Sequence, residues 1–124
     1  MPNPYSNYRM TEINTASPVR LIVLLYEGAI RNIKKGEILL QDPNSFVEAG
    51  VHLLKAMDIV SELMGCLKPD SSPEISDNLS KIYAYVIGRI GRALQDKDPA
   101  PLAGATEIMS SLSSAWAEID SGGN

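Results

Sequence analysis

The sequence has very few residues of the kinds that build covalent or metal-linked sites, with 1 cysteine and 1 histidine among 124 residues. The single cysteine, Cys66, excludes an intrachain disulfide and any zinc site made from a cysteine cluster. The single histidine, His52, lies four residues after Glu48 rather than the three of a Glu-x-x-His metal motif, and no second such pair exists. We therefore expect neither a metal site nor a cofactor.

Long apolar runs and excess positive charge are also missing. The longest aliphatic run, residues 21–25, is far shorter than the roughly 20 residues that span a bilayer. Residues 1–12 have neither the basic start nor the apolar core of a secretory signal. Asp and Glu number 15 against 11 Lys and Arg, a balance that disfavours a binder of nucleic-acid phosphates. We expect a cytoplasmic protein that neither binds nucleic acid nor inserts into a membrane.

What the sequence does contain is a repeated helix-start signal. A residue with a side-chain oxygen precedes a proline at Ser17-Pro18, Asp42-Pro43, Ser72-Pro73 and Asp98-Pro99. Such an oxygen can cap a helix, and proline fits the first helical position. These signals predict helices at 18–41, 44–67, 73–96 and 99–120. Ser45 offers a second start for the helix at 44–67, because Glu48 would complete a capping box with it.

Apolar periodicity supports a helical bundle. In three of the four predicted helices, apolar or small residues recur at spacings of three and four, which is typical of a helix face that packs on a core. Connections of roughly 2 to 6 residues make successive helices antiparallel. We predict an all-α, antiparallel up-down-up-down four-helix bundle over residues 17–120. Residues 1–16 are expected to form an extended or short-helical lid packed on it, and residues 121–124 a flexible tail.

Three predicted helices carry more apolar residues than one buried face requires. The surplus residues are Leu21, Val23, Leu24, Leu25 and Ile30, then Val47, Val51, Leu54, Ile59 and Leu63, then Tyr83, Ile87 and Leu94. One interpretation is a wide core, partly covered by the N-terminal segment. The other is a groove that receives an apolar segment of a partner. The two are compatible if the N-terminal segment is a removable lid.

Candidate catalytic residues are few. His52-Leu53-Leu54-Lys55 matches the His-x-Leu-Lys of histidine phosphotransfer domains, but Asp58 would place a like charge near a phosphate. We expect His52 to face solvent and Cys66 to be a buried, inert thiol. The glycines within the helices imply either close helix packing or a partner that approaches the backbone closely. Phosphate relay through His52 remains an alternative function; otherwise no residue indicates an enzyme.

Several motifs together resemble those of the flagellin-specific export chaperone family (FliS-type). They are Tyr5-Ser6-Asn7-Tyr8, Thr15-Ala16-Ser17-Pro18, Leu21, Leu25-Tyr26-Glu27-Gly28-Ala29-Ile30, Lys55-Ala56 with Ile59 and Glu62-Leu63, Leu79 with Tyr83 and Tyr85, and Ala115-Trp116. They occur in the family's order and extend over residues 4–119, nearly the whole chain.

The resemblance implies a chaperone that binds the disordered C-terminal segment of flagellin in apolar grooves. It would prevent premature polymerisation and deliver flagellin to the export gate of the flagellar type III apparatus. An anti-sigma factor is a further candidate partner, and the chain would be a monomer or a weak homodimer. The expected partner-binding residues are Tyr5, Tyr8 and Ile13 in the lid and Leu21, Leu25, Tyr26, Leu54 and Tyr83 in the groove.

Overall fold

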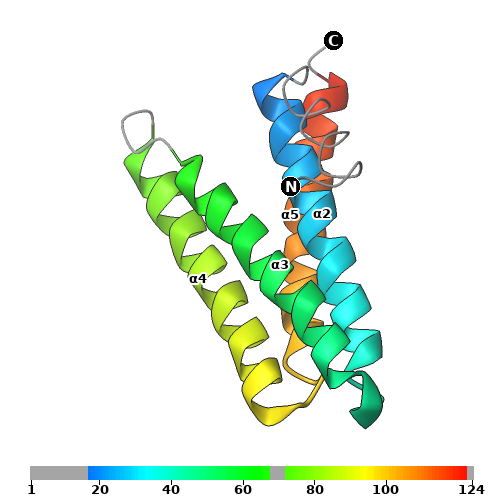
Figure 1. The fold of residues 1–124 in the computed structure, drawn as a ribbon. Helices are drawn as coiled ribbons and strands as arrows, with labels where there is room; N and C mark the ends of the chain where they lie inside the picture. Colours follow the sequence, from blue (N-terminus) through cyan, green and yellow to red (C-terminus); the bar gives the residue numbers. More distant parts are fainter. Residues whose placement is uncertain (1–16, 68–71, 123–124) are drawn as a thin grey trace, which may run out of the picture.

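The computed structural model describes residues 17–67 and 72–122, which form four α-helices and a short 3-10 turn (Figure 1). The elements are α2 (Pro18–Leu39), η1 (Pro43–Ser45), α3 (Phe46–Gly65), α4 (Pro73–Asp96) and α5 (Leu102–Gly122). Consecutive helices run in opposite directions, as the short connections require. The prediction of an all-α antiparallel four-helix bundle is confirmed, and the predicted ranges differ from the observed ones only near the helix ends.

Two of the predicted helix caps are present as hydrogen bonds. The Ser17 hydroxyl accepts from the Arg20 amide at 3.1 Å, and Pro18 occupies the first turn of α2. The Asp42 carboxylate accepts from the Asn44 amide at 3.0 Å and so begins η1. These interactions satisfy amide groups that have no partner within the helix itself.

The alternative helix start at Ser45 is confirmed, because α3 begins at Phe46 with Ser45 as its N-cap residue. The Ser45 hydroxyl donates to the Asp42 carboxylate at 3.1 Å, however, so its side chain does not cap α3 and the expected capping box with Glu48 does not form. Helix α5 begins at Leu102 rather than at Pro99, because Asp98 accepts from the Ala100 amide at 3.0 Å and holds a turn there. At both places a nearby side chain forms a local turn that competes with the expected cap.

The four helices share one core. Helix α2 packs against α3 and α5, and α4 packs against α3 and α5, with the α3–α4 pair inclined to the α2–α5 pair (Figure 1). Every helix contributes fully buried side chains, among them Ile33, Leu53, Ile90 and Met109. Gly36 permits the close approach of α2 and α3, because a Cβ atom at this position would collide with the side chain of Leu53.

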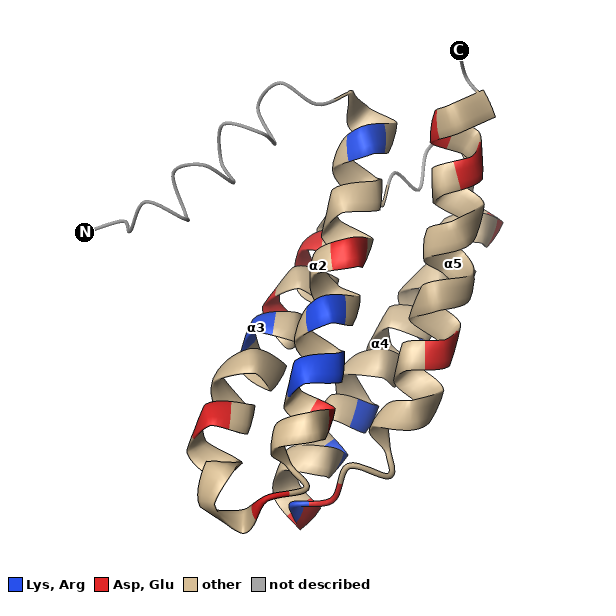
Figure 2. Cartoon of the chain, turned by 90° about the vertical axis from the view of Figure 1, so that its right-hand side faces the viewer, with Lys and Arg blue, Asp and Glu red and all other residues tan. Residues whose placement is uncertain are grey.

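The apolar surplus of α2 is taken up by this core. Val23 and Leu25 are buried, and Leu21, Leu24 and Ile30 are half-buried. The exposed face of α2 instead carries charges of both signs, including Glu27 and Arg31, whereas α5 carries acidic residues and no basic ones (Figure 2). For α2, the interpretation of the surplus as a wide core is correct.

Candidate functional site: an apolar surface on helices α3 and α4

Helix α3 displays a row of large apolar side chains to solvent. Val47, Val51 and Leu54 are 82%, 61% and 56% exposed, respectively. Their spacing of four and then three residues aligns them along one face of the helix, and we call this row the α3 stripe. The opposite face of α3 carries the buried residues Ala49, Leu53, Ala56 and Val60. Helix α3 is therefore apolar on two opposite faces, only one of which the fold buries.

Helix α4 extends this apolar surface. A Cβ atom built on Gly50 would lie 4.0 Å from Leu94 Cδ2, so these two positions face each other across the α3–α4 boundary. Since the helices are antiparallel, residues further along α3 face residues earlier in α4. We define the α3–α4 surface as the α3 stripe together with Gly50, Met57, Ile87, Gly91 and Leu94.

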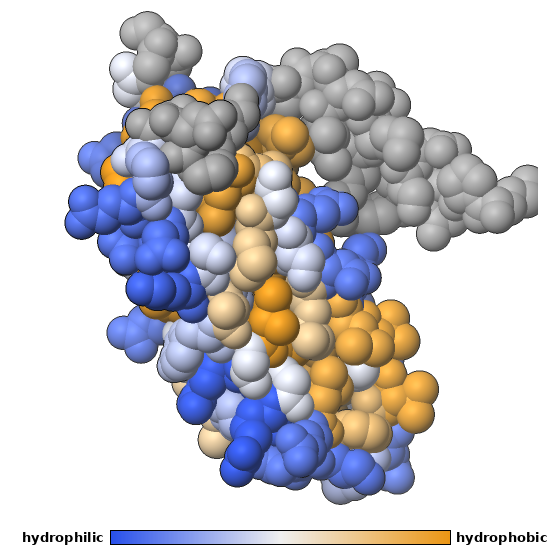
Figure 3. All heavy atoms as spheres, turned by 90° about the vertical axis from the view of Figure 1, so that its left-hand side faces the viewer, coloured by the Kyte–Doolittle hydropathy of each residue, from blue (hydrophilic) through white to orange (hydrophobic). Residues whose placement is uncertain are grey.

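Figure 3 looks at the molecule from the side where α4 lies and shows a hydrophobic patch at the right-hand edge of its lower half, next to hydrophilic surface on the left and at the bottom. Met57, Ile87 and Leu94 are partly buried and pack against the core, while the α3 stripe stands out from it. Exposed apolar patches of this kind on single domains usually mark a binding site. The α3–α4 surface is therefore the candidate site.

The sequence-predicted partner-binding residues occupy different environments. Leu54 lies on the α3 stripe and Leu21 is half-buried in α2. Leu25, Tyr26 and Tyr83 are buried core residues, so their side chains offer no surface to a docked segment in this conformation. Tyr5, Tyr8 and Ile13 lie outside the described residues. Val47 and Val51 were recognised in the sequence as surplus but not selected as site residues, although their spacing with Leu54 was the available signal.

Tyr26 and Tyr83 form a polar contact inside the core. Their hydroxyl oxygens are 2.5 Å apart, and the bond joins α2 to α4 across the bundle. Burial raises the pKa of both phenols. The hydrogen bond to Tyr26 raises the pKa of Tyr83 further, whereas hydrogen bonds to Tyr83 and Trp116 partly offset the rise in the pKa of Tyr26. The contact gives each of the two buried hydroxyls a hydrogen-bond partner in an apolar core.

His52 was expected to face solvent, but the structure places it elsewhere. It is half-buried between α3 and α2, where its Nδ1 lies 3.1 Å from Asn32 Oδ1. The Asn32 amide donates to the Gly28 carbonyl at 2.8 Å, which orients its oxygen toward the imidazole. A phosphotransfer histidine needs an exposed ring, and here the ring is part of the helix interface. The buried Asn32 was not recognised in the sequence, because it stands between the charged residues Arg31 and Lys34 and so does not differ from the polar residues of an exposed face.

Cys66 was expected to be buried but is exposed. It is the residue that follows the last turn of α3. Among residues 17–67 and 72–122, no three His, Cys, Asp or Glu side chains are close enough to hold a metal ion. In the same ranges, every helix is too short or too polar to cross a membrane.

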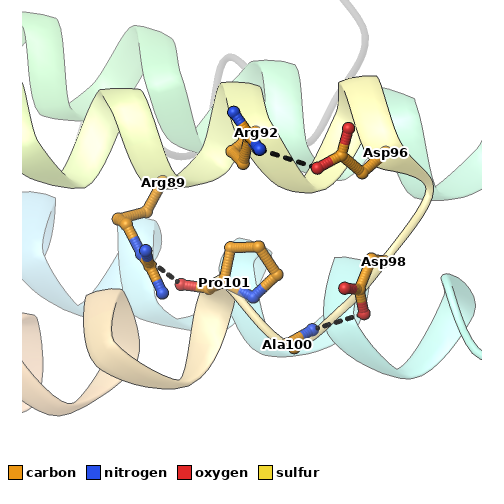
Figure 4. A network of polar contacts seen from close by, with 6 residues as sticks. All are labelled: Arg89, Arg92, Asp96, Asp98, Ala100 and Pro101. Carbon is orange, nitrogen blue, oxygen red and sulfur yellow. Dashed lines mark hydrogen bonds and ion pairs between the residues drawn. The ribbon is translucent and has the colours of Figure 1, made fainter.

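A polar hollow lies at the corner between α4 and α5 (Figure 4). It encloses about 500 Å³ and is open to solvent. Arg89 Nε donates to the Pro101 carbonyl at 3.0 Å, and Arg92 pairs with Asp96 at 2.7 Å. With Asp98 also lining the hollow, its basic and acidic residues balance each other, and their contacts serve mainly to hold the turn.

Helix α4 ends at this corner with Lys97 in the left-handed conformation, at a φ of 52°. Glycine usually occupies such a position, because it has no side chain to clash. The Lys97 ammonium lies 4.8 Å from the centre of the Phe46 ring, a favourable contact with the start of α3 that only the longer side chain makes.

Comparison with known proteins identifies the family. A family model described as "Flagellar protein FliS" matches residues 1–123. The flagellar secretion chaperone FliS of Vibrio cholerae is 32% identical over 88% of this chain and 79% of that protein. The proteins of the same name from Salmonella typhimurium and Bacillus subtilis are 30% and 27% identical, covering 86% and 92% of this chain and 79% and 84% of theirs. The chain therefore belongs to the FliS family of flagellar secretion chaperones.

Proposed function

We propose that this chain is a flagellar export chaperone that binds the C-terminal segment of flagellin on the α3–α4 surface. The observation that carries the proposal is the α3 stripe, three large apolar side chains exposed on the outer face of a helix in a protein of this family. A self-assembling chain end is an aggregation hazard before export, and burying its apolar face against this surface would remove that hazard. Delivery to the export gate would follow from holding flagellin unassembled.

The size of the α3 stripe indicates how much of the cargo must bind. Covering the exposed parts of the three aliphatic side chains contributes on the order of 3–6 kcal/mol, taking about 1.5–3 kcal/mol for a side chain that is buried completely. Association and ordering of a flexible segment cost about as much or more. The flagellin segment must therefore extend beyond the stripe, over Met57, Ile87 and Leu94, to bind stably.

The N-terminal segment completes the proposal. Tyr5, Tyr8 and Ile13 remain predicted lid or contact residues, and residues 1–16 would leave the apolar surface when cargo binds. The anti-sigma factor and the weak homodimer also remain predictions from the sequence. Phosphate relay through His52 is not supported, because the family comparison indicates a chaperone and the His52 ring is hydrogen-bonded within the helix interface.

Isothermal titration of the full chain with a peptide of the flagellin C-terminal segment tests the proposal. We expect saturable one-to-one binding with a negative heat-capacity change, the mark of apolar burial. Leu54→Asp should weaken binding at least about tenfold, since a charge would be buried against the cargo. Ile119→Asp is a matched control on α5, because Ile119 is 55% exposed and Leu54 56%. Absence of binding by the unsubstituted chain, or equal losses in both variants, would contradict the proposal.

A further inference from the structure

The glycines inside the helices differ in whether the bundle leaves room for a side chain. Glycine is unfavourable in a helix interior relative to alanine, so each one calls for a physical reason. At Gly36 the reason is packing, because any side chain would collide with Leu53. At Gly91 a Cβ atom would meet nothing within 4 Å, and at Gly50 it would make only an ordinary contact of 4.0 Å with Leu94. Packing within the bundle therefore does not require glycine at Gly50 or Gly91.

Both of these glycines belong to the α3–α4 surface. Gly50 faces Leu94, and Gly91 lies one turn before Leu94 on the same side of α4. Gly50 lies three residues after Val47 and one before Val51, so it borders the α3 stripe. Because glycine has no side chain, the protein surface at these two positions is recessed relative to the apolar residues beside them. The glycines thus leave room beside the apolar residues Val51 and Leu94.

Any segment that lies on this surface must satisfy its own backbone hydrogen bonds. The amides and carbonyls in the middle of α3 and α4 are used within those helices, so an extended segment would find no backbone partners there. A helical segment carries its own hydrogen bonds and presents an apolar face. Small residues at a helix contact let the two backbones approach more closely than larger ones do.

We propose that Gly50 and Gly91 are close-approach positions for a helical part of the flagellin segment, whose backbone lies nearer to α3 and α4 there than alanine would allow. This inference rests on the proposed function, since it specifies how the cargo occupies the same surface. Glycine at these positions lowers helix stability in the free protein and permits a closer contact in the complex. Substitution by alanine should accordingly separate folding from binding.

The experiment compares Gly50→Ala and Gly91→Ala with Gly88→Ala in the full chain. Gly88 is a matched control, because a Cβ atom there also meets nothing within 4 Å, yet it lines the polar hollow at the α4–α5 corner. Each variant should raise the midpoint of thermal unfolding by about 3–5 °C through the better helix propensity of alanine. Titration with the flagellin peptide should show affinity reduced about three- to tenfold for Gly50→Ala and Gly91→Ala, and unchanged for Gly88→Ala.

Gly91→Leu extends the series, because a longer side chain should hold the cargo further away and reduce affinity by more than Gly91→Ala does. Wild-type affinity in Gly50→Ala and Gly91→Ala would overturn the inference while leaving the proposed function intact. A lower unfolding midpoint in Gly91→Ala would overturn it too, by showing that the fold needs this glycine. If the unsubstituted chain does not bind the peptide, the proposed function itself is wrong.

Discussion

Helices α2 and α3 have similar apolar excess but use it in opposite ways. In α2 the surplus residues lie beside the core face, so Val23 and Leu25 are buried and the remainder half-buried. In α3 the surplus residues Ile59 and Leu63 are buried as well, but Val47, Val51 and Leu54 lie opposite the core face and stay exposed. Apolar residues next to a buried face widen the core, whereas apolar residues on the far side have no neighbour in the bundle to cover them. Position around the helix, rather than apolar content, decides whether a surplus apolar residue is buried or exposed.

Leu25→Ala should have the largest effect of the substitutions that test this comparison. Leu25 is 2% exposed, and truncating such a leucine removes buried area and leaves a cavity, so we expect a loss of about 2–5 kcal/mol in the free energy of unfolding. Urea unfolding followed by circular dichroism measures it. A loss below about 1 kcal/mol would show that α2 is not buried as described.

Gly36→Ala should reduce stability by roughly 1–3 kcal/mol, because the added methyl group forces Leu53 from its place in a packed core. Thermal unfolding of the variant beside Gly91→Ala gives the sharpest contrast, since the two alanine substitutions should shift the midpoint in opposite directions. If the unfolding midpoint rises in both variants, Gly36 is not packed against Leu53 as closely as the structure shows.

Alkaline pH should destabilise the core through Tyr26 and Tyr83. Their pKa values are raised in the folded state, so the unfolded chain loses these protons first as the pH rises. The stability that the two phenols contribute is therefore fully present below about pH 10 and is lost above it, by about 1.4 kcal/mol per pH unit for each tyrosine. Urea unfolding at several pH values measures the slope, and Tyr83→Phe should make it shallower. An unchanged slope in that variant would contradict the assignment to Tyr83.

Leu54→Ala should have the smallest effect on stability, within about 0.5 kcal/mol, because most of the side chain is already in water. Its affinity for the flagellin peptide should nevertheless fall about three- to tenfold, as contact area is lost from the α3 stripe. The free energy of unfolding and the affinity for the flagellin peptide can be measured on one preparation of each variant, so that Leu54→Ala is compared directly with Leu25→Ala. If Leu54→Ala unfolds the protein as readily as Leu25→Ala does, the distinction between the two helices fails.

Most of the fold was predictable because helix limits depend on local chemistry. Ser17 with Pro18 marked the start of α2 correctly, since a cap involves only residues a few positions apart. At Ser45 the position of the helix start was also predicted correctly, but the Ser45 hydroxyl donates to the nearby Asp42 carboxylate, so the expected side-chain cap does not form. His52 and Cys66 were misplaced for a different reason. Exposure of a residue near the edge of a helix face depends on which neighbour covers that edge, and the helical period does not contain this information.

The sequence by itself determined that there are helices, where they begin and end to within a few residues, and that α3 is apolar on two faces. Only the tertiary structure decided which of those faces is buried, that Tyr26 and Tyr83 belong to the core, and that Gly36 is needed for packing while Gly50 and Gly91 are not. The physical reason is that periodicity specifies the angle of a side chain around its own helix. Burial depends on which other helix lies at that angle, and that is settled only when all the helices pack together.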